Sequence, residues 1–243
     1  MYEILHCSSE VVPFSKSGGL ADVSSALPEA LSRLGHRVSI VTPLYATVDR
    51  NRHGIVPARR GFDVTIGGRT ETFDVHEAEL PSGTHVYLLE NEAFFGRPQL
   101  YGTRDGAYED NHLRYAFFSA AAFRLLRALR LRPDVLHCHD WQTALVPVYN
   151  HLFHLDMFAT VMTIHNLAYQ GLFPSASLPE VSLPWELFNP EQLEFWGKVN
   201  FLKAGLVFAD RITTVSPRYA REILTDEMGC GLQGVLRKRA GVL

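Results

Sequence analysis

The sequence predicts an α/β protein with a doubly wound, mostly parallel sheet into which a β-hairpin is inserted. Three observations support this prediction. Short apolar strands alternate with amphipathic helices in both halves of the chain, the first strand–helix–strand unit has about the minimum length of a parallel crossover, and polar residues follow several strands directly. Ligands of such sheets bind beyond the carboxyl ends of the strands, so we expect these polar residues to form one site.

The N-terminal segment predicts a β-α-β unit. Residues 2–7 are expected to form a strand, and a helix is expected from near Leu20 until Gly35, a residue type that often ends helices. A second strand over residues 37–42 ends at Pro43. The short connection favours parallel pairing with a right-handed crossover.

The following segment breaks this alternation. Within residues 62–80, two runs with the residue alternation typical of β-strands flank Gly67-Gly68, a pattern typical of a β-hairpin. Residues 85–90 predict one more strand, and residues 91–111 are rich in glycine, aromatic and charged residues, which indicates a functional loop.

The second half returns to alternating strands and helices, and Ser216 followed by Pro217 is a strong helix start. The expected elements are a helix over 112–131, a strand over 133–140, a helix over 142–153, a strand over 159–166, a proline-containing loop over 171–190, a helix over 191–209, and a strand over 211–215.

Composition excludes several classes of protein. Of the 243 residues 47% are hydrophobic, which argues against a disordered chain, and a net charge of -3 gives no overall field that would attract nucleic acid or an anionic membrane. The first ten residues do not resemble a signal peptide, and no apolar run is long enough for a membrane span. Three widely spaced cysteines argue against disulfides or a zinc site, so we expect a cytoplasmic protein.

The first candidate site is the segment from Lys16 to Asp22, between the first strand and the first helix. Gly18 and Gly19 allow close approach of a ligand, the helix N-terminus offers free N–H groups to an anion, and Lys16 adds a positive charge. A pyrophosphate would suit this arrangement, although a glycine-rich turn with a solvated lysine is an equally good interpretation. The segment matches neither a dinucleotide-binding fingerprint nor a P-loop.

The second candidate site follows the strand over residues 133–140. His137 and His139 share one face of that strand and could bind a metal together with His165, but hydrogen-bonded histidines at the end of a sheet are the favoured interpretation. Asp140 and Trp141 at the carboxyl end of the strand could hold and stack a sugar.

Two further segments are rich in polar or aromatic groups. His165, Asn166, Tyr169 and Gln170 follow the strand over 159–166 and would be poor core residues unless they line a site; a loop that satisfies its own hydrogen bonds is the alternative. Tyr101 lies in a loop whose aromatic residues could stack on a sugar, although anchoring the loop is the commoner role.

Taken together, these motifs resemble the N-terminal half of bacterial glycogen synthases and plant starch synthases. The segments that carry the resemblance, which runs from residue 2 to the end of the chain, are KSGGLADV, HCHDWQ, TIHNLAYQG, NFLKAGLVFAD and TTVSPRYAREI. The resemblance implies a retaining glycosyltransferase with two Rossmann-like domains in the GT-B arrangement. Such an enzyme transfers glucose from ADP-glucose, sometimes UDP-glucose, to the non-reducing end of an α-1,4-glucan, without a metal or other cofactor.

The resemblance also implies roles for individual residues. Lys16, Gly18 and Gly19 would bind the pyrophosphate or the transferred sugar, and Asp22 would help to fix their loop. The residues expected to contact sugar are His165, nearest the anomeric centre, Asn166 beside it, and Tyr101 and Asp140 for the donor sugar or the acceptor glucan. Ser17 stands where the family commonly has threonine, and Gln142 where it commonly has histidine, so Gln142 is given no catalytic role.

Residues 1–243 are therefore expected to form a single N-terminal catalytic domain, without the nucleotide-binding domain that supplies the rest of the site in the family. Two hypotheses follow. The chain is the donor-side half of a synthase and is active only with the missing domain, or it is a non-catalytic module that binds glucan or sugar. A third, less favoured class is a metal-dependent hydrolase that uses His137, His139 and His165.

Overall fold

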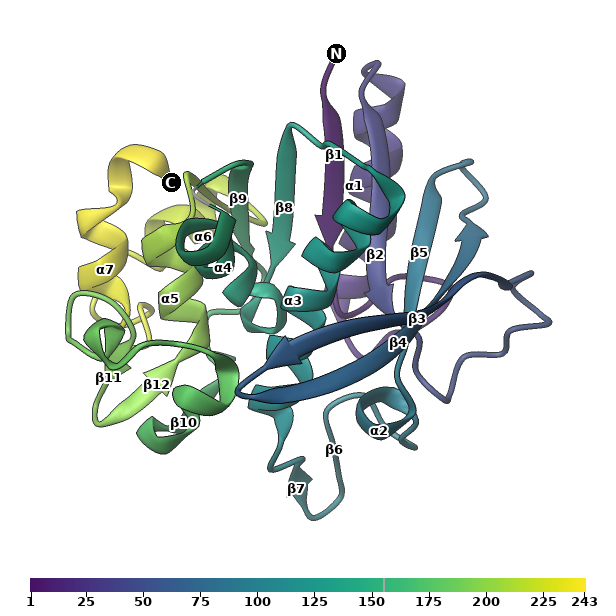
Figure 1. Ribbon diagram of the computed structural model, residues 1–243. Helices are drawn as coiled ribbons and strands as arrows, with labels where there is room; N and C mark the ends of the chain where they lie inside the picture. Colours follow the sequence, from purple (N-terminus) through teal and green to yellow (C-terminus); the bar gives the residue numbers. More distant parts are fainter. Residues whose placement is uncertain (155) are drawn as a thin grey trace.

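The structure, a computed structural model, describes residues 1–154 and 156–243 and is organised around an eight-stranded sheet (Figure 1). The strand order is β13-β9-β8-β1-β2-β5-β4-β3. Six neighbouring strands are parallel to one another: β1 (Glu3–Cys7), β2 (Arg37–Pro43), β5 (His85–Glu90), β8 (Val135–His139), β9 (Ala159–Ile164) and β13 (Arg211–Thr214). The predicted α/β fold with a mostly parallel sheet is confirmed.

The sheet reverses its strand order between β1 and β8. From β1 the chain proceeds to β2 and β5 on one side, and later returns to build β8, β9 and β13 on the other. Such a reversal creates a crevice beyond the carboxyl ends of the two strands that flank it. In Figure 1 the arrowheads of β1 and β8 point to the same lower edge of the sheet, which marks the location of that crevice.

The predicted hairpin forms one edge of the sheet. β3 (Val56–Ile66) and β4 (Arg69–Glu79) are antiparallel, and β4 also pairs antiparallel with β5. Gly67 and Gly68 have φ of 55° and 76° at the turn, a left-handed backbone that glycine adopts without steric cost. The hairpin starts earlier than residue 62 and packs against a helix, where the Arg124 guanidinium lies 5.0 Å from the centroid of the Phe62 ring.

Helices cover the sheet largely where the sequence predicts them. They are α1 (Gly19–Arg33), α2 (Glu92–Phe95), α3 (Asn111–Leu129), α4 (Leu145–His154), α5 (Phe201–Phe208), α6 (Pro217–Glu222) and α7 (Gln233–Lys238), with 3-10 turns at Trp141–Thr143, Ser175–Ser177, Pro179–Val181, Trp185–Leu187 and Ala240–Val242. Gly35 follows α1 with φ 87°, and Ser216 caps α6 by accepting from Tyr219 N. No helix among the described residues is both long and apolar enough to span a membrane.

The prediction of one helix over residues 191–209 is wrong. β11 (Glu194–Phe195) and β12 (Lys198–Asn200) join β10 (Leu172–Pro174) in a small antiparallel sheet, and the helix α5 begins only at Phe201. Trp196 and Gly197 both have positive φ, which reverses the chain, and the Asn200 side chain caps α5 by accepting from Lys203 N. Apolar spacing alone cannot distinguish this short hairpin from a helical turn.

Residues 91–111, predicted as a loop, contain α2 and a short hairpin of β6 (Gly102–Thr103) and β7 (Gly106–Ala107). A fully buried arginine on α3 organises this segment. The Arg114 side chain donates to the carbonyl oxygens of Phe94 (2.7 Å) and Leu100 (2.9 Å) and to the Asn111 side chain (2.7 Å). These bonds fasten the start of the segment to its end.

Candidate active site

A cavity of about 720 Å³ lies beyond the carboxyl ends of β1, β8 and β9, at the reversal of strand order. Five parts of the chain line it: the loop that leads into α1 with the start of that helix, the Tyr101 segment, the end of β8, the turn after β9, and Val215 directly after β13. Of the predicted site residues, the cavity is lined by Gly18, Gly19, Tyr101, Asp140, His165 and Asn166. The predicted motifs therefore converge on one site.

Glu10 is the organising residue of the N-terminal wall. It is buried, and one of its carboxylate oxygens accepts hydrogen bonds from the backbone N–H groups of Ser17 and Gly18. The other oxygen accepts from the hydroxyl groups of Ser17 (2.6 Å) and Tyr101 (2.6 Å). An internal carboxylate thus uses backbone donors that we expected to be available to a phosphate.

Lys16 and Asp22 lie next to this wall, and the described residues that line the cavity include neither of them. The Lys16 ammonium instead donates to both carboxylate oxygens of Asp22, at 2.7 and 2.8 Å. Both side chains are more than half exposed. An exposed pair of this kind is weak and breaks easily, so the lysine can reorient toward an anion at low cost.

Asp140 holds the turn after β9. Its Oδ1 accepts from the backbone N–H of His165 at 2.8 Å, and its own backbone has φ 55°, which a non-glycine residue rarely adopts. Burial is the largest influence on this carboxyl and raises its pKa to about 7, although hydrogen bonds from the backbone of His165 and Asn166 oppose the rise. The carboxyl of Asp140 both lines the cavity and positions the residues that follow β9.

His165 and Asn166 face the cavity from that turn. Burial lowers the pKa of His165 to about 4, so its ring is neutral at pH 7. Its Nε2 lies 3.0 Å from Nδ1 of His139. Asn166 is exposed, and its side chain accepts from the backbone of Ala168 at 3.0 Å. Gln170 does not line the cavity; it is buried and donates to the carbonyl oxygens of Leu167 and Cys230.

The histidines of the second motif are hydrogen-bonded, in agreement with the favoured interpretation. His137 Nε2 lies 2.6 Å from Thr163 Oγ1, and both ring nitrogens of His139 face other histidines. Within the described part of the chain, one group of histidines is close enough to share an ion, and its members are His6, His137 and His139 rather than the set that includes His165. Because His139 uses both nitrogens, this group is a poor metal ligand set.

Glu10 was absent from the predicted site residues, and Gln142 had been given no catalytic role. Glu10 is an acid in an apolar segment directly after the first strand, and that position was its only signal in the sequence. Gln142 lines the cavity and is buried, and its Oε1 has no hydrogen-bond partner among the described residues. Buried polar atoms are usually paired, so this oxygen is available to a ligand.

The aromatic residues of the Tyr101 segment do not act together. Tyr101 reaches the cavity, where its hydroxyl lies 2.8 Å from Ser9 Oγ. Phe94 and Phe95 are buried in the core. The Tyr108 ring lies against two arginine side chains, with its centroid 4.8 Å from Cζ of Arg97 and 5.0 Å from Cζ of Arg114. Most of these rings anchor the segment.

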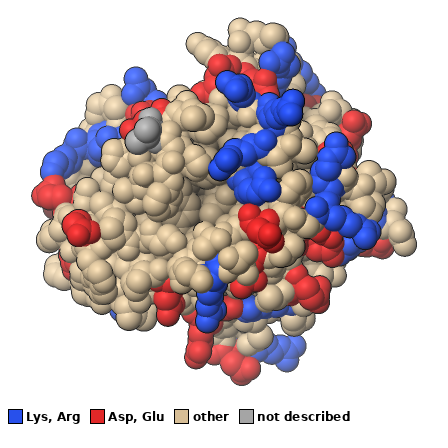
Figure 2. All heavy atoms as spheres, in the orientation of Figure 1, with Lys and Arg blue, Asp and Glu red and all other residues tan. Residues whose placement is uncertain are grey.

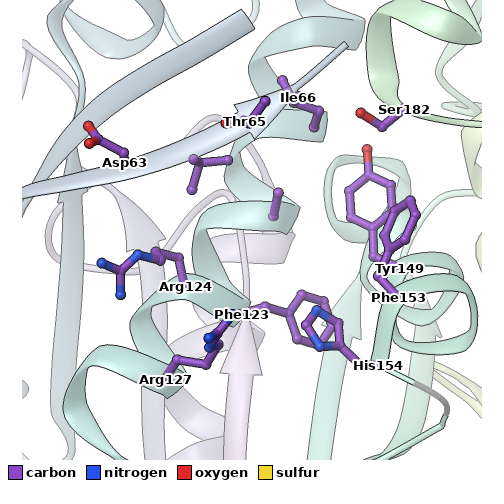
Figure 3. A pocket seen from close by; sticks show the side chains of 12 residues that line it. Asp63, Thr65, Ile66, Phe123, Arg124, Arg127, Tyr149, Phe153, His154 and Ser182 are labelled. Carbon is purple, nitrogen blue, oxygen red and sulfur yellow. The ribbon is translucent and has the colours of Figure 1, made fainter. Parts of the chain in front are cut away.

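A smaller cavity of about 360 Å³ lies between the hairpin, α3 and α4 (Figure 3). Arg124 and Arg127 lie on one side of it, and the rings of Phe123 and His154 stack with centroids 4.2 Å apart. Lys and Arg side chains form a band on this face of the molecule, beside a hollow without charged residues (Figure 2). The smaller cavity contains no predicted site residue, and the strand residues that line it belong to the hairpin strand β3 and not to the parallel strands.

A family model for the starch synthase catalytic domain matches residues 3–238. The chain belongs to this family. Glycogen synthase 2 of Geobacter sulfurreducens is 47% identical over 242 residues, and a glycogen synthase of an Anaeromyxobacter species is 50% identical over 244 residues. The chain covers 98% of its own length in both matches and 50% of each relative. It thus spans about half the length of these curated relatives.

A solved structure agrees with this assignment. The catalytic domain of starch synthase IV from Arabidopsis thaliana, determined with ADP and acarbose, superposes with a TM-score of 0.89 at 32% identity. The match covers 99% of this chain and 50% of that one. The resemblance to glycogen and starch synthases is therefore confirmed, and this chain corresponds to half of a glycogen synthase-type glycosyltransferase fold.

Proposed function

We propose that this chain is the donor-side domain of a glycogen or starch synthase, which transfers glucose from ADP-glucose to the non-reducing end of an α-1,4-glucan with retention of configuration. The observation that carries the proposal is the convergence of Gly18, Gly19, Asp140, His165 and Asn166 on one cavity at the switch point of the sheet. The plant relative bound to ADP and acarbose supports a nucleotide sugar and a glucan as substrates.

The roles that we propose follow from the chemistry of the cavity walls. Gly18 and Gly19, where a Cβ would meet no atom within 4 Å, leave room for the pyrophosphate or the sugar. Lys16 would turn from Asp22 toward the phosphates, and Asp22 would keep the lysine nearby in the free protein. Charge on the departing phosphates is the main need of the reaction. Glu10 takes the N–H groups of Ser17 and Gly18, so Lys16 and the donors at the start of α1 that Glu10 does not use would meet it.

The sugar-facing wall would position the glucosyl unit. His165 is neutral and half-buried and would contact the sugar near its anomeric centre, with Asn166 beside it. Asp140 and Tyr101 would bind the donor sugar or the acceptor glucan. The bond to ADP would break through an oxocarbenium-like transition state, while the acceptor hydroxyl attacks from the same face. This mechanism requires no metal or other cofactor.

We further propose that residues 1–243 act as one domain whose activity requires a second domain across the cavity. The chain spans half of its relatives, which supports this view. UDP-glucose is an alternative donor. Three widely spaced cysteines support a reducing cytoplasm as the location of the chain. The alternative function is a module that binds glucan without turnover.

Transfer of radiolabelled glucose from ADP-glucose to glycogen tests the proposal. We expect no transfer by the 243-residue chain alone, and transfer once the C-terminal half of the Geobacter synthase is added. His165→Ala should abolish most of this restored transfer, whereas His151→Ala, on the exposed part of α4, should not change it. Glycogen binding without transfer in any combination would favour the binding module.

A further inference from the structure

Three imidazoles form a continuous hydrogen-bonded chain from the core of the sheet to the cavity. His6 on β1 places its Nδ1 3.0 Å from Nε2 of His139 on β8, and Nδ1 of His139 lies 3.0 Å from Nε2 of His165. His6 and His139 are fully buried, while His165 is half-buried and lines the cavity. The inner two residues lie outside the cavity wall, and the proposed function gives them no role.

All three rings are neutral near pH 7. Burial is the main cause, and it lowers the pKa of His6 and His139 well below the usual value and that of His165 to about 4. The other titratable groups that influence them are His137, whose ring centroid lies 4.5 Å from that of His139, and Glu10, which acts on His165. A neutral imidazole has one N–H donor and one acceptor nitrogen.

This rule couples the tautomers of the three rings. If His6 donates to His139, then His139 must donate to His165, and the proton of His165 lies on Nδ1. If His165 donates inward instead, the proton of His6 must lie on its Nε2. Both hydrogen bonds therefore run either outward, toward the cavity, or inward, toward the core.

His6, at the inner end of the three hydrogen-bonded histidines, decides between the two directions. Nε2 of His6 is buried and has no hydrogen-bond partner among the described residues. The inward direction would place an N–H there without an acceptor, whereas the outward direction leaves only a lone pair. Buried N–H groups without a partner are rarer in proteins than acceptors that lack one, so the outward direction is favoured.

We propose that His6 and His139 are positioning residues that fix His165 as its Nδ1–H tautomer. Nδ1 of His165 has no hydrogen-bond partner among the described residues, and the residue lines the cavity. The three hydrogen-bonded histidines thus offer the bound substrate an N–H donor in place of a lone pair. The value of this donor for glucosyl transfer rests on the proposed function, because a donor stabilises negative charge or binds a sugar oxygen.

Nitrogen NMR of the 243-residue chain with labelled histidine tests the tautomer directly at pH 7.5. We expect His165 to show a protonated Nδ1 and a bare Nε2. A protonated Nε2 in the wild type would overturn the proposal. This measurement requires no turnover, so it stands whether or not the chain transfers glucose.

Two substitutions of similar polarity at His139 test the coupling. The amide of His139→Asn can occupy the place of Nδ1 and still donate to His165, whereas the amide of His139→Gln reaches toward His6 and leaves Nε2 of His165 without its partner. We expect the Nδ1–H form of His165 to dominate in His139→Asn and to mix with the other tautomer in His139→Gln. An unchanged tautomer in His139→Gln would show that His139 does not fix it.

Where transfer is restored by the second domain, the same pair separates positioning from stability. His139→Gln should lower kcat about tenfold to hundredfold, as for other groups that orient a histidine, with little change in KM for ADP-glucose. His139→Asn should recover most of that loss, and His151→Gln serves as the control. Equal losses in both His139 variants would indicate a structural role and contradict the proposal. Absence of transfer in the wild type would refute the proposed function alone.

Discussion

Replacing Asp140 with asparagine should make the folded chain more stable at neutral pH than the wild type, and by an amount that depends on pH. Asp140 is 7% exposed, and burial raises the pKa of its carboxyl from 3.8 to about 7. This difference in pKa between the unfolded and the folded chain corresponds to about 4 kcal/mol of unfolding free energy. Asparagine keeps an oxygen that can accept from His165 N but has no charge to bury.

The direction of the pH effect follows from the raised pKa. Below pH 3.8 the carboxyl is protonated in both states and contributes nothing. Between pH 3.8 and about 7 this carboxyl ionises in the unfolded chain but not in the folded chain, so the contribution of Asp140 to the stability of the wild type falls as the pH rises. Asp140→Asn lacks this loss, and the difference in unfolding free energy should grow by up to about 4 kcal/mol across the window and then stay constant.

Urea denaturation of both proteins, followed by tryptophan fluorescence from pH 4 to 8, measures this difference. The comparison removes the contribution of histidines that titrate over the same range in both proteins. Glu227→Gln is the matched control, because Glu227 is exposed and forms no ion pair among the described residues, and it should shift stability by less than about 0.5 kcal/mol at any pH. A difference between wild type and Asp140→Asn that does not vary with pH would refute the reasoning.

Two further predictions concern packing and acid stability. Gly171 has φ 63°, and a Cβ there would lie 2.6 Å from the Trp141 ring, so Gly171→Ala should lower the unfolding free energy measured in urea by about 2–4 kcal/mol. Gly54→Ala, at φ 61° in open space, should lower it clearly less. Equal losses in the two variants would contradict the clash. Burial lowers the pKa of both His137 and His165 to about 4, so below pH 6.5 the unfolded chain takes up protons that the folded chain does not. The contribution of each ring to the unfolding free energy should therefore fall on acidification from pH 6.5 to 4, by up to about 1.4 kcal/mol per pH unit. Replacing either histidine with glutamine should reduce the slope of stability against pH.

Local patterns in the sequence predicted most of the parallel sheet. Strands such as β1 and β8 are short apolar runs that end in polar residues, and Gly35 and the pair Ser216-Pro217 mark helix ends whose chemistry does not depend on the rest of the fold. The region 191–209 was mispredicted because its apolar residues suit both a helix and a short hairpin. There the positive φ at Trp196, together with pairing to β10, decided the outcome.

The sequence by itself determined the family, the succession of the main strands along the chain and the segments that supply the site, because these depend on residue type and spacing along the chain. Only the tertiary structure showed that Glu10 binds the backbone N–H groups of the Ser17–Gly18 turn and that His6 reaches His139. Both contacts join residues from separate parts of the chain, and the second joins residues 133 positions apart. Burial, which sets the pKa values of Asp140 and His165, likewise arises only when the strands pack together.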